Sequence, residues 1–333
     1  MILQMVVKKI ALVGLGKQNI EQHLPAVLAS NMVELIAACD TDVSTLNNFA
    51  KIHKDVECYT CFHDLIKSTN RPDLIIAALP HEQYVQVIEI SAQMGIHILK
   101  EKPFARTLDE GKQIHQTING SNIKLMTTSQ RRFDPIFSAG RAMIGAIGRI
   151  HHITASYKIS GQRPNVGWRG SMESAGGGVL LDMGYHLIDL IMWYIDPLDS
   201  VYCKTSKRNN ADYDTEDTAT VEFTIGNEIS GSLFVSCVSS EKGEFIEFLG
   251  ERGSVILGKS SVKWVDSKYT VLEEIERTEG WRSAMVRQLN YFIDVIDEKT
   301  VHKFSAPEYH LNNHLKIIQA CYESSKRNSL IKI

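Results

Sequence analysis

Three polar residues interrupt one of the most apolar stretches of the chain. Asp182, His186 and Asp189 lie in the run 179–194 at positions i, i+4 and i+7. On a helix these spacings place side chains on one face. An aspartate can hold an imidazole in one tautomer and stabilise its protonated form, which suits proton transfer near neutral pH. Because a buried polar stripe is costly without partners, the sequence predicts either a stripe that faces a pocket or an Asp–His pair satisfied within the core.

A lysine in a distinctive context precedes this run. Lys102 stands in the triplet Glu101-Lys102-Pro103, directly after the short apolar segment 97–99. If that segment is a parallel strand, the lysine lies at the carboxyl edge of the sheet, where open α/β folds bind ligands. Pro103 restricts Lys102 to extended backbone geometry. The triplet indicates a lysine aimed at the reactive end of a cofactor, and the alternative is a solvated lysine at a strand end.

A glycine turn near the N-terminus has the context of a dinucleotide-binding fingerprint. Gly14 and Gly16 follow a short apolar run and precede a helical pattern over 20–30. Glycines in such a turn let the backbone approach a pyrophosphate, which binds at the helix N-terminus. The third position of the fingerprint holds Asn19, where a Gly or Ala ordinarily permits close packing of helix on strand. The alternative interpretation is a tight turn without a ligand.

Asp40 adds to the nucleotide interpretation. It ends the apolar run 33–39 and lies 24 residues after Gly16, near the roughly 20 that the fingerprint expects. A carboxylate there accepts hydrogen bonds from the adenosine ribose hydroxyls and repels a 2′-phosphate, so we expect NAD rather than NADP as cofactor. The alternative role of Asp40 is the N-cap of the following helix, although Asp42 or Ser44 could fill that role.

The elements that must position these residues follow two patterns. Over the first 130 residues, apolar runs alternate with helical patterns, which is typical of a doubly wound parallel sheet. After about residue 149, strand patterns follow one another, which indicates a mostly antiparallel open sheet. We therefore expect an α/β protein with a Rossmann domain over 1–128 and a second α/β domain over 129–333. Turn signals in the second half are Gly226-Asn227 and 251–253, and helical patterns end the chain at about 283–296 and 307–327.

Composition excludes several classes of function. The 333 residues carry 36 Lys and Arg against 39 Asp and Glu, a net charge of −3, which leaves no electrostatic footprint for nucleic acid or an anionic membrane. No apolar run reaches the roughly 18 residues of a membrane helix, and no signal peptide is recognised. We expect a reduced, cytoplasmic protein whose six cysteines are free thiols.

We expect no metal site. Cys58 and Cys61 form one C-x-x-C, but the second pair of a zinc ribbon is missing from the sequence. A redox pair is the other interpretation of these two thiols. His310 and His314 have helical spacing, but no Glu completes an H-E-x-x-H frame.

Together these residues resemble the Gfo/Idh/MocA oxidoreductases, the glucose–fructose oxidoreductase and inositol dehydrogenase family. The resemblance rests on the glycine turn, Asp40, the triplet at 101–103 and the block 176–189, and the last two in this order are specific. It implies a Rossmann domain followed by a substrate-binding domain whose open, largely antiparallel sheet often supports homodimers or homotetramers. It also implies hydride transfer between a nicotinamide and a secondary alcohol or ketone of a sugar, sugar derivative or cyclitol.

The resemblance implies a catalytic set of Lys102, Asp182 and His186. His186 takes the alcohol proton during oxidation or returns it during reduction, and Asp182 orients His186 and binds a neighbouring hydroxyl. Lys102 donates a hydrogen bond to the reactive oxygen. Whether Lys102 or His186 makes the first proton transfer stays open. The implied cofactor contacts are Gly14, Gly16, Lys17, Gln18, Asn19, Asp40, Leu79, Pro80, His81, Tyr84, Glu101 and Lys102.

The chain departs from the family pattern in the loop after the fourth strand pattern, where the family often has an Asn and a His beside the nicotinamide. Here His81 and Tyr84 occupy the loop, and either could contact the cofactor or the substrate. On a later loop, Trp168 could stack on a sugar face, and Arg163 and Arg169 could bind phosphate or carboxylate, or this loop is simply solvated. Further substrate candidates near the domain junction are Tyr157, Gln130, Arg131 and Arg132.

Two other functions are compatible with the same fold. One is a glycosidase that uses tightly bound NAD as a transient oxidant. The other is a non-catalytic regulator that binds a nucleotide and a partner protein. Asn19 is the one sequence feature that points to the regulator, whereas the set Lys102, Asp182 and His186 speaks against it.

Overall fold

The computed structural model describes residues 7–160, 167–208 and 212–333. The chain forms two compact units, and neither is continuous in sequence. The first unit consists of the chain up to Ala105, Asp109–Gln130 and Glu279–His310. The second unit consists of Arg106–Leu108, Arg131–Thr278 and Leu311–Ile333.

The first unit contains the predicted doubly wound sheet, which confirms the expected Rossmann fold. Its six strands have the order β3-β2-β1-β4-β5-β6, and every neighbouring pair is parallel. Helices cover the sheet, so residues of both its faces are buried. This is why the short strands are apolar along their length. They are β1 (Lys8–Val13), β2 (Val33–Cys39), β3 (Glu57–Tyr59), β4 (Leu74–Ala77), β5 (His97–Lys100) and β6 (Leu125–Thr127).

Helices join these strands at positions that local sequence signals mark. Asp42 caps α2 by accepting the Ser44 N–H at 2.9 Å, and Gly95 ends α4 in the left-handed conformation at φ +70°. The helix after the glycine turn opens as a π-helical turn, η1 (Asn19–His23), and continues as α1 (Leu24–Ala29). The other helices of this layer are α2 (Val43–Ile52), α3 (Phe62–Lys67), α4 (Tyr84–Met94) and α5 (Leu108–Asn119).

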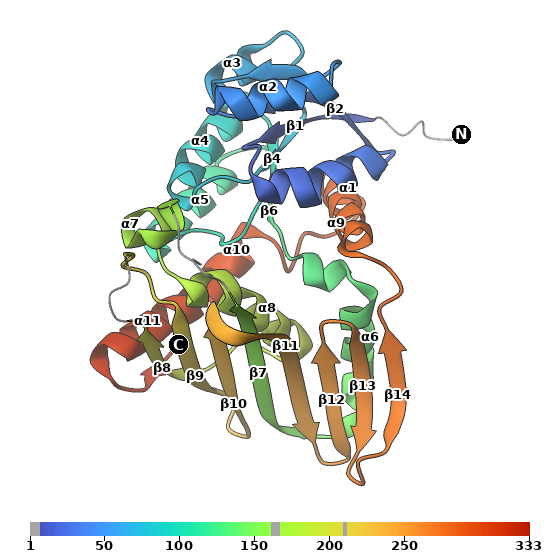
Figure 1. Ribbon diagram of the computed structural model, residues 1–333, viewed down its shortest axis with the longest axis vertical. Coiled ribbons are helices and arrows are strands. Elements are labelled where there is room, and N and C mark those ends of the chain that lie inside the picture. Colours follow the sequence, from blue (N-terminus) through green and yellow to red (C-terminus); the bar gives the residue numbers. More distant parts are fainter. Residues whose placement is uncertain (1–6, 161–166, 209–211) are drawn as a thin grey trace. The chain divides into compact units, whose positions relative to one another are not determined.

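The segment Glu279–His310 packs with the first unit, whereas the sequence placed it in the second domain. Its helix α9 (Trp281–Ile296) lies beside α1, as Figure 1 shows. The Ser30 hydroxyl donates to the Asn290 side chain at 2.7 Å, and the buried Gln288 side chain accepts the Ser129 N–H at 2.8 Å. Periodicity predicted this helix correctly but contains no information about which sheet its apolar face covers.

The second unit is built on a sheet that has nine strands among the residues described. The order is β14-β13-β12-β11-β7-β10-β9-β8-β15, and β7 with β10 is the one parallel pair in that described sheet. The predicted turn at 226–227 joins the antiparallel strands β9 and β10, and the one at 251–253 joins β11 and β12. The strands are β7 (Ile150–Ser160), β8 (Ser200–Ser206), β9 (Thr218–Ile225), β10 (Ile229–Ser236), β11 (Val238–Gly250), β12 (Gly253–Gly258), β13 (Ser261–Asp266), β14 (Val271–Glu276) and β15 (Ile331–Lys332).

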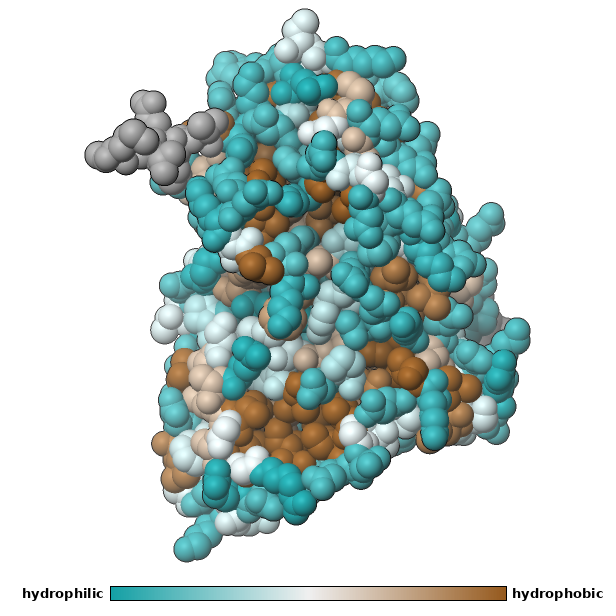
Figure 2. Space-filling model, turned by 180° about the vertical axis from the view of Figure 1, so that it is seen from behind, coloured by the Kyte–Doolittle hydropathy of each residue, from teal (hydrophilic) through white to brown (hydrophobic). Residues whose placement is uncertain are grey.

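Three helices of the second unit pack against this sheet. Helix α6 (Pro135–Met143) contacts β12 and β13, α8 (Tyr185–Tyr194) contacts β7, and α11 (Lys316–Arg327) contacts β8. Figure 2 shows hydrophobic side chains gathered on the surface of this unit, which is drawn at the bottom of the view. No helix in the described ranges is long and apolar enough to cross a membrane. The shorter helices are α7 (Met172–Ala175) in this unit and α10 (Pro307–Tyr309) in the first.

Candidate active site

The glycine turn has the geometry that close approach of a ligand requires. Gly14 follows β1 at φ +83°, and a Cβ atom there would lie 2.4 Å from the carbonyl oxygen of Ala78. A side chain at Gly14 would therefore break the turn. At Gly16, by contrast, an added Cβ would meet no described atom within 4 Å. The backbone at Gly16 is thus open to an approaching phosphate, and this cradle fits a dinucleotide.

Asn19 takes part in the same turn. Its side chain is fully buried, and Nδ2 donates to the carbonyl oxygens of Val13 at 3.1 Å and Gly14 at 2.6 Å. The amide thus satisfies backbone acceptors of the turn from inside the fold, a task that the usual small residue cannot perform. This explains why Asn19 is compatible with the turn geometry. Among its neighbours, Lys17 is exposed, and Gln18 donates to the Glu101 carboxylate at 3.0 Å.

Asp40 stands at the carboxyl end of β2 and holds the turn. One oxygen accepts the Leu15 N–H at 2.6 Å, and the other accepts the Asp42 N–H at 2.8 Å. The N-cap of α2 is Asp42, so the alternative role for Asp40 as this cap is wrong. Asp40 is half-buried at the edge of the sheet where the glycine turn lies.

Glu101 connects η1 to the end of β5 within the first unit. Its side chain is buried and lies 2.8 Å from Nε2 of His23, which ends η1. Burial raises the pKa of this carboxyl, but the hydrogen bond from His23 and the charges of His23 and Lys102 outweigh burial and lower it to about 2. Glu101 therefore ties the helix after the glycine turn to the end of β5.

Lys102 follows the end of β5 and is half-exposed. Its backbone N–H donates to the Thr128 hydroxyl at 3.2 Å, and its peptide bond to Pro103 is cis. Strand β4 pairs with β5, so the loop after β4 lies at the same edge of the sheet. In this loop Leu79, Pro80 and His81 are half-buried.

Tyr84 has an internal position instead of the ligand contact that the sequence suggested. It is 2% exposed, and its hydroxyl accepts the Leu79 N–H at 3.3 Å and donates to the Ala77 carbonyl oxygen at 3.4 Å. The Nζ atom of Lys100 lies 3.8 Å from the centre of the Tyr84 ring. Lys100 is fully buried, although it directly follows the predicted strand 97–99 and no sequence motif marks it.

In the second unit, a glycine triplet and Glu216 position the helix that carries Asp182. A Cβ at Gly178 would lie 1.9 Å from the backbone oxygen of Glu216, so only glycine fits there. The buried Glu216 carboxylate accepts the N–H groups of Gly178 at 2.9 Å and Leu180 at 3.0 Å, and the Tyr322 hydroxyl donates to it at 2.9 Å. These contacts fix the start of the π-helical turn η6 (Leu180–Gly184). No sequence motif marked Glu216, which lies far along the chain.

The polar stripe of this helix divides into two parts. Asp189 is buried, and both its oxygens accept from Arg132, at 2.7 and 2.9 Å, while Nε2 of His314 lies 2.8 Å away. Burial raises the pKa of Asp189, but the charge of Arg132 outweighs it and holds the pKa well below its usual range. Arg132 and His314 therefore satisfy Asp189 in the core. Asp182 and His186 stay half-exposed although their neighbours on η6 and α8 are buried.

Tyr157 lies on β7 in the second unit. It is half-buried, and burial raises the pKa of its hydroxyl. The charge of Arg131 opposes this rise, whereas the charges of Glu244 and Asp182 add to it. The guanidinium of Arg131 lies 5.4 Å from the Tyr157 ring centre and pairs with Glu244 at 2.7 Å. Arg132, by contrast, forms a buried ion pair with Asp189. It is therefore an internal residue and not a ligand for substrate.

The loop before the glycine triplet is described only from residue 167. Trp168 is half-buried, and the exposed Arg169 guanidinium lies 4.3 Å from the centre of its ring. This stacking shields one face of the indole. Arg163 lies outside the described residues.

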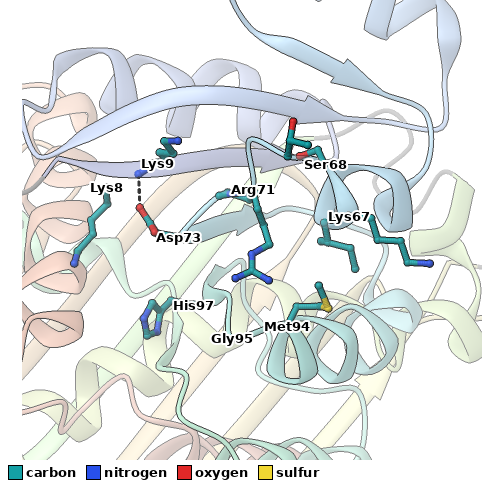
Figure 3. A pocket seen from close by; sticks show the side chains of 12 residues that line it. Lys8, Lys9, Lys67, Ser68, Arg71, Asp73, Met94, Gly95 and His97 are labelled. Atoms are coloured by element: carbon teal, nitrogen blue, oxygen red, sulfur yellow. Dashed lines mark hydrogen bonds between the residues drawn. The ribbon is translucent and has the colours of Figure 1, made fainter.

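A cavity of about 630 Å³ in the first unit lies at the wrong edge of the sheet for the nucleotide (Figure 3). Lys8 and Lys9 begin β1, Asp73 precedes β4 and His97 begins β5, so the amino ends of the strands line this cavity. The Lys9 N–H donates to Asp73 at 2.7 Å across it. Open α/β sheets bind ligands at the carboxyl ends, where the glycine turn, Asp40 and Lys102 lie.

The parallel sheet and its glycine cradle have the geometry of a nucleotide-binding Rossmann domain. Comparison with protein families agrees: residues 8–129 match the oxidoreductase family with an NAD-binding Rossmann fold, and residues 141–256 match the GFO/IDH/MocA C-terminal domain. Together these ranges cover more than half of the chain. The chain belongs to the Gfo/Idh/MocA family, which confirms the resemblance seen in its sequence.

Several relatives match nearly the whole chain. D-glucoside 3-dehydrogenase of Escherichia coli (strain K12) is 20% identical over 98% of this chain and 97% of its own. The WlbA dehydrogenase of Bordetella pertussis, solved in complex with NADH and UDP-GlcNAcA, is 22% identical with a TM-score of 0.81 and covers 98% of this chain and 99% of its own. A levoglucosan dehydrogenase in complex with NADH and levoglucosan is 17% identical with a TM-score of 0.87 and covers 98% and 100%. At these identities the structural likeness establishes the fold.

Proposed function

We propose that this protein transfers a hydride between NAD and a secondary alcohol or ketone of a sugar or sugar derivative. The observation that carries the proposal is the split of the polar stripe in the second unit. Asp189 is satisfied in the core, whereas Asp182 and His186 remain half-exposed on an otherwise buried helix. An acid and an imidazole that keep accessible surface on so apolar a helix can meet a ligand, which is the pattern of a functional site.

Each member of the proposed catalytic set has one task. A bound nicotinamide would supply the hydride acceptor for oxidation and the hydride donor for reduction. His186 takes the proton of the alcohol as the C–H hydride leaves, and it returns that proton in the reverse direction. Asp182 orients His186 and stabilises the imidazolium. Lys102 donates a hydrogen bond to the reactive oxygen and lowers its basicity.

We propose NAD rather than NADP as the cofactor. The Asp40 carboxylate lies at the end of β2, where the fingerprint places the group that binds the adenosine ribose. A 2′-phosphate there would meet a negative charge. Gly14, Gly16, Lys17, Gln18 and Asn19 form the turn for the pyrophosphate. The loop residues Leu79, Pro80 and His81 are assigned to the nicotinamide side.

The proposed substrate is a sugar or sugar derivative, because the named relatives include a glucoside dehydrogenase and a levoglucosan dehydrogenase. Tyr157, half-buried on β7 of the same unit as Asp182, is a further substrate candidate. Trp168 offers an aromatic face for a sugar ring, and Arg169 and Arg163 are the cations of that loop. A cyclitol is an outcome that the substrate panel must include.

Turnover of a substrate panel tests the proposal. Purified protein is supplied with NAD and D-glucosides, levoglucosan, UDP-sugars and cyclitols, and NADH formation is followed by absorbance. We expect one class to react, and His186→Ala to lower kcat by about 100-fold or more. His63→Ala, which changes an exposed histidine, is the matched control. Unchanged turnover in His186→Ala would remove its assigned role, and an aryl glycoside cleaved without net NADH would identify a glycosidase instead.

A homodimer or homotetramer is also proposed, because family members often assemble through the second sheet. Exposed apolar side chains on β11, Phe245 at 39% and Leu249 at 37%, support an assembly through this unit. Light scattering on the eluting protein measures the mass directly. A monomer at all working concentrations contradicts this part of the proposal.

A further inference from the structure

Lys100 is a charged side chain in the interior of the first unit. It ends β5, directly before the Glu101-Lys102-Pro103 triplet, and none of its surface is exposed. Its ammonium donates to the carbonyl oxygen of Glu101 at 2.7 Å and to that of Pro103. These carbonyls belong to the residues on either side of Lys102. Lys100 thus forms hydrogen bonds with the backbone on both sides of the proposed catalytic lysine.

The same ammonium also reaches the neighbouring loop. It lies 3.8 Å from the Tyr84 ring centre, a cation–π distance. The Tyr84 hydroxyl in turn bonds the backbone of Ala77 and Leu79, at the start of the loop after β4. Lys100 and Tyr84 therefore connect the two loops that follow β4 and β5 at the carboxyl edge of the sheet.

An apolar residue would fill this interior position at lower cost. A buried ammonium loses its hydration, and three neighbouring charges act on Lys100: Glu101 and Glu110 favour the charged form, while Lys102 opposes it. Burial is the largest effect and lowers the pKa of Lys100 to about 7. Since the backbone carbonyls and the Tyr84 ring are the groups that the ammonium contacts, the compensating gain lies in fixing the backbone around Lys102.

We propose that Lys100 is a positioning residue, which holds the Lys102 backbone and couples it to the loop after β4. The proposal rests on the proposed function only in so far as Lys102 is a catalytic residue. The hydrogen bonds of Lys100 to the backbone around Lys102 do not depend on that role, and their effect can be measured without any substrate. Misplacing a catalytic group by about 1 Å can lower a rate by about 100-fold.

The test compares Lys100→Met with Lys112→Met. Methionine has a similar length and no donor, and Lys112 is an exposed lysine of α5 in the same unit. Hydrogen exchange measured by mass spectrometry reports the amides of residues 101–106 in the ligand-free protein. We expect exchange there to be about 10-fold faster in Lys100→Met than in wild type. Lys112→Met should exchange as wild type does in this segment.

Kinetics supplies the second readout once a substrate is known. We expect Lys100→Met to lower kcat by about 10- to 100-fold while KM for NAD changes less than about twofold. Lys100→Gln, which keeps two N–H donors without the charge, should recover part of the protection and part of kcat. A residue that only supports the fold would lower the stability of the whole unit without this split between kcat and KM.

Three results would overturn the proposal. The first is wild-type exchange of residues 101–106 in Lys100→Met. The second is faster exchange spread evenly over the unit. The third is that neither Lys100 variant folds although Lys112→Met does, which would make Lys100 a stability residue. If the panel finds no substrate at all, the proposed function fails, while the exchange data still decide the role of Lys100.

Discussion

Oε1 of Glu101 lies 2.8 Å from Nε2 of His23, and both side chains are buried. This contact joins the helix after the glycine turn to the strand end that carries Lys102. The pair therefore links the proposed pyrophosphate turn and the proposed catalytic lysine inside one unit, before any ligand binds.

The Glu101–His23 pair predicts sensitivity to acid. The pKa of Glu101 is lowered to about 2 from 4.5, so its stabilisation is complete above about pH 4.5 and is lost as the pH falls toward 2. The loss amounts to about 3 kcal/mol of unfolding free energy. Urea unfolding between pH 2 and 6 measures it. Glu101→Gln should be less stable at pH 6 and less dependent on pH, and a parallel pH dependence in the variant would contradict the assignment.

Lys100 predicts a second rise of stability with pH, in a higher pH range. Its pKa is lowered to about 7 from 10.5, so the unfolded chain binds the proton more strongly than the folded protein does. Stability should therefore rise with pH between about 7 and 10, with a contribution of up to about 1.4 kcal/mol per pH unit. Urea unfolding of Lys100→Met should lack this contribution, whereas Lys112→Met should retain it. Equal slopes in all three proteins would show that Lys100 does not titrate in this range.

The two glycines of the turn should respond differently to alanine. Gly14→Ala places a Cβ 2.4 Å from the Ala78 oxygen at a positive φ, so we expect a loss of about 2 kcal/mol or more in stability. Gly16→Ala enters open space, so stability should change by less than about 0.5 kcal/mol. Its expected defect is weaker NAD binding, by about 10-fold or more in calorimetry. If Gly16→Ala binds NAD normally, the pyrophosphate does not approach this backbone.

Substitution of Asp189 should affect mainly stability, and substitution of Asp182 mainly activity. Asp189→Asn leaves Arg132 and His314 buried without their anion, so we expect about 3–5 kcal/mol of destabilisation. Asp182→Asn should change stability by about 1 kcal/mol or less and lower kcat by about 100-fold. Denaturant unfolding and steady-state kinetics on both variants make the comparison. The assignment fails if Asp182→Asn is the destabilised protein and remains active.

Asp40 predicts the choice of nucleotide. We expect calorimetry to give tighter binding of NAD than of NADP to the wild type. Asp40→Asn keeps an acceptor for the Leu15 N–H but removes the charge, so it should weaken NAD binding by about 10-fold and reduce the discrimination against NADP. Tighter NADP binding to the wild type would contradict the ribose assignment.

Local sequence patterns predicted the elements well where short-range physics decides them. Parallel strands, the glycine turn, the hairpin at 226–227 and the cap of a helix each depend on residues close in sequence. The division into two discontinuous units did not follow, because the amphipathic pattern of α9 fits any apolar surface. Strands β13 and β14 carry many charged residues, so alternation did not mark them clearly.

Residue types singled out the site but did not assign partners. Asp182, His186 and Asp189 were predicted as one stripe, and only the fold shows that Arg132 and His314 take Asp189. The sequence indicates a ligand contact for Tyr84, because an aromatic residue beside a loop gives no sign of burial, whereas the fold buries it. Lys100 and Glu216 were missed, since a lysine or glutamate in sequence suggests the surface.

The return of residues 279–310 to the first unit has a consequence for synthesis of the protein. A ribosome must translate nearly the whole polypeptide before α9 can cover α1. Until then the nucleotide-binding half exposes the apolar surface that this helix hides, and a fragment ending near residue 130 would keep that surface bare permanently. The N-terminal half should accordingly depend on late translation to mature, and expressing it alone should yield aggregates.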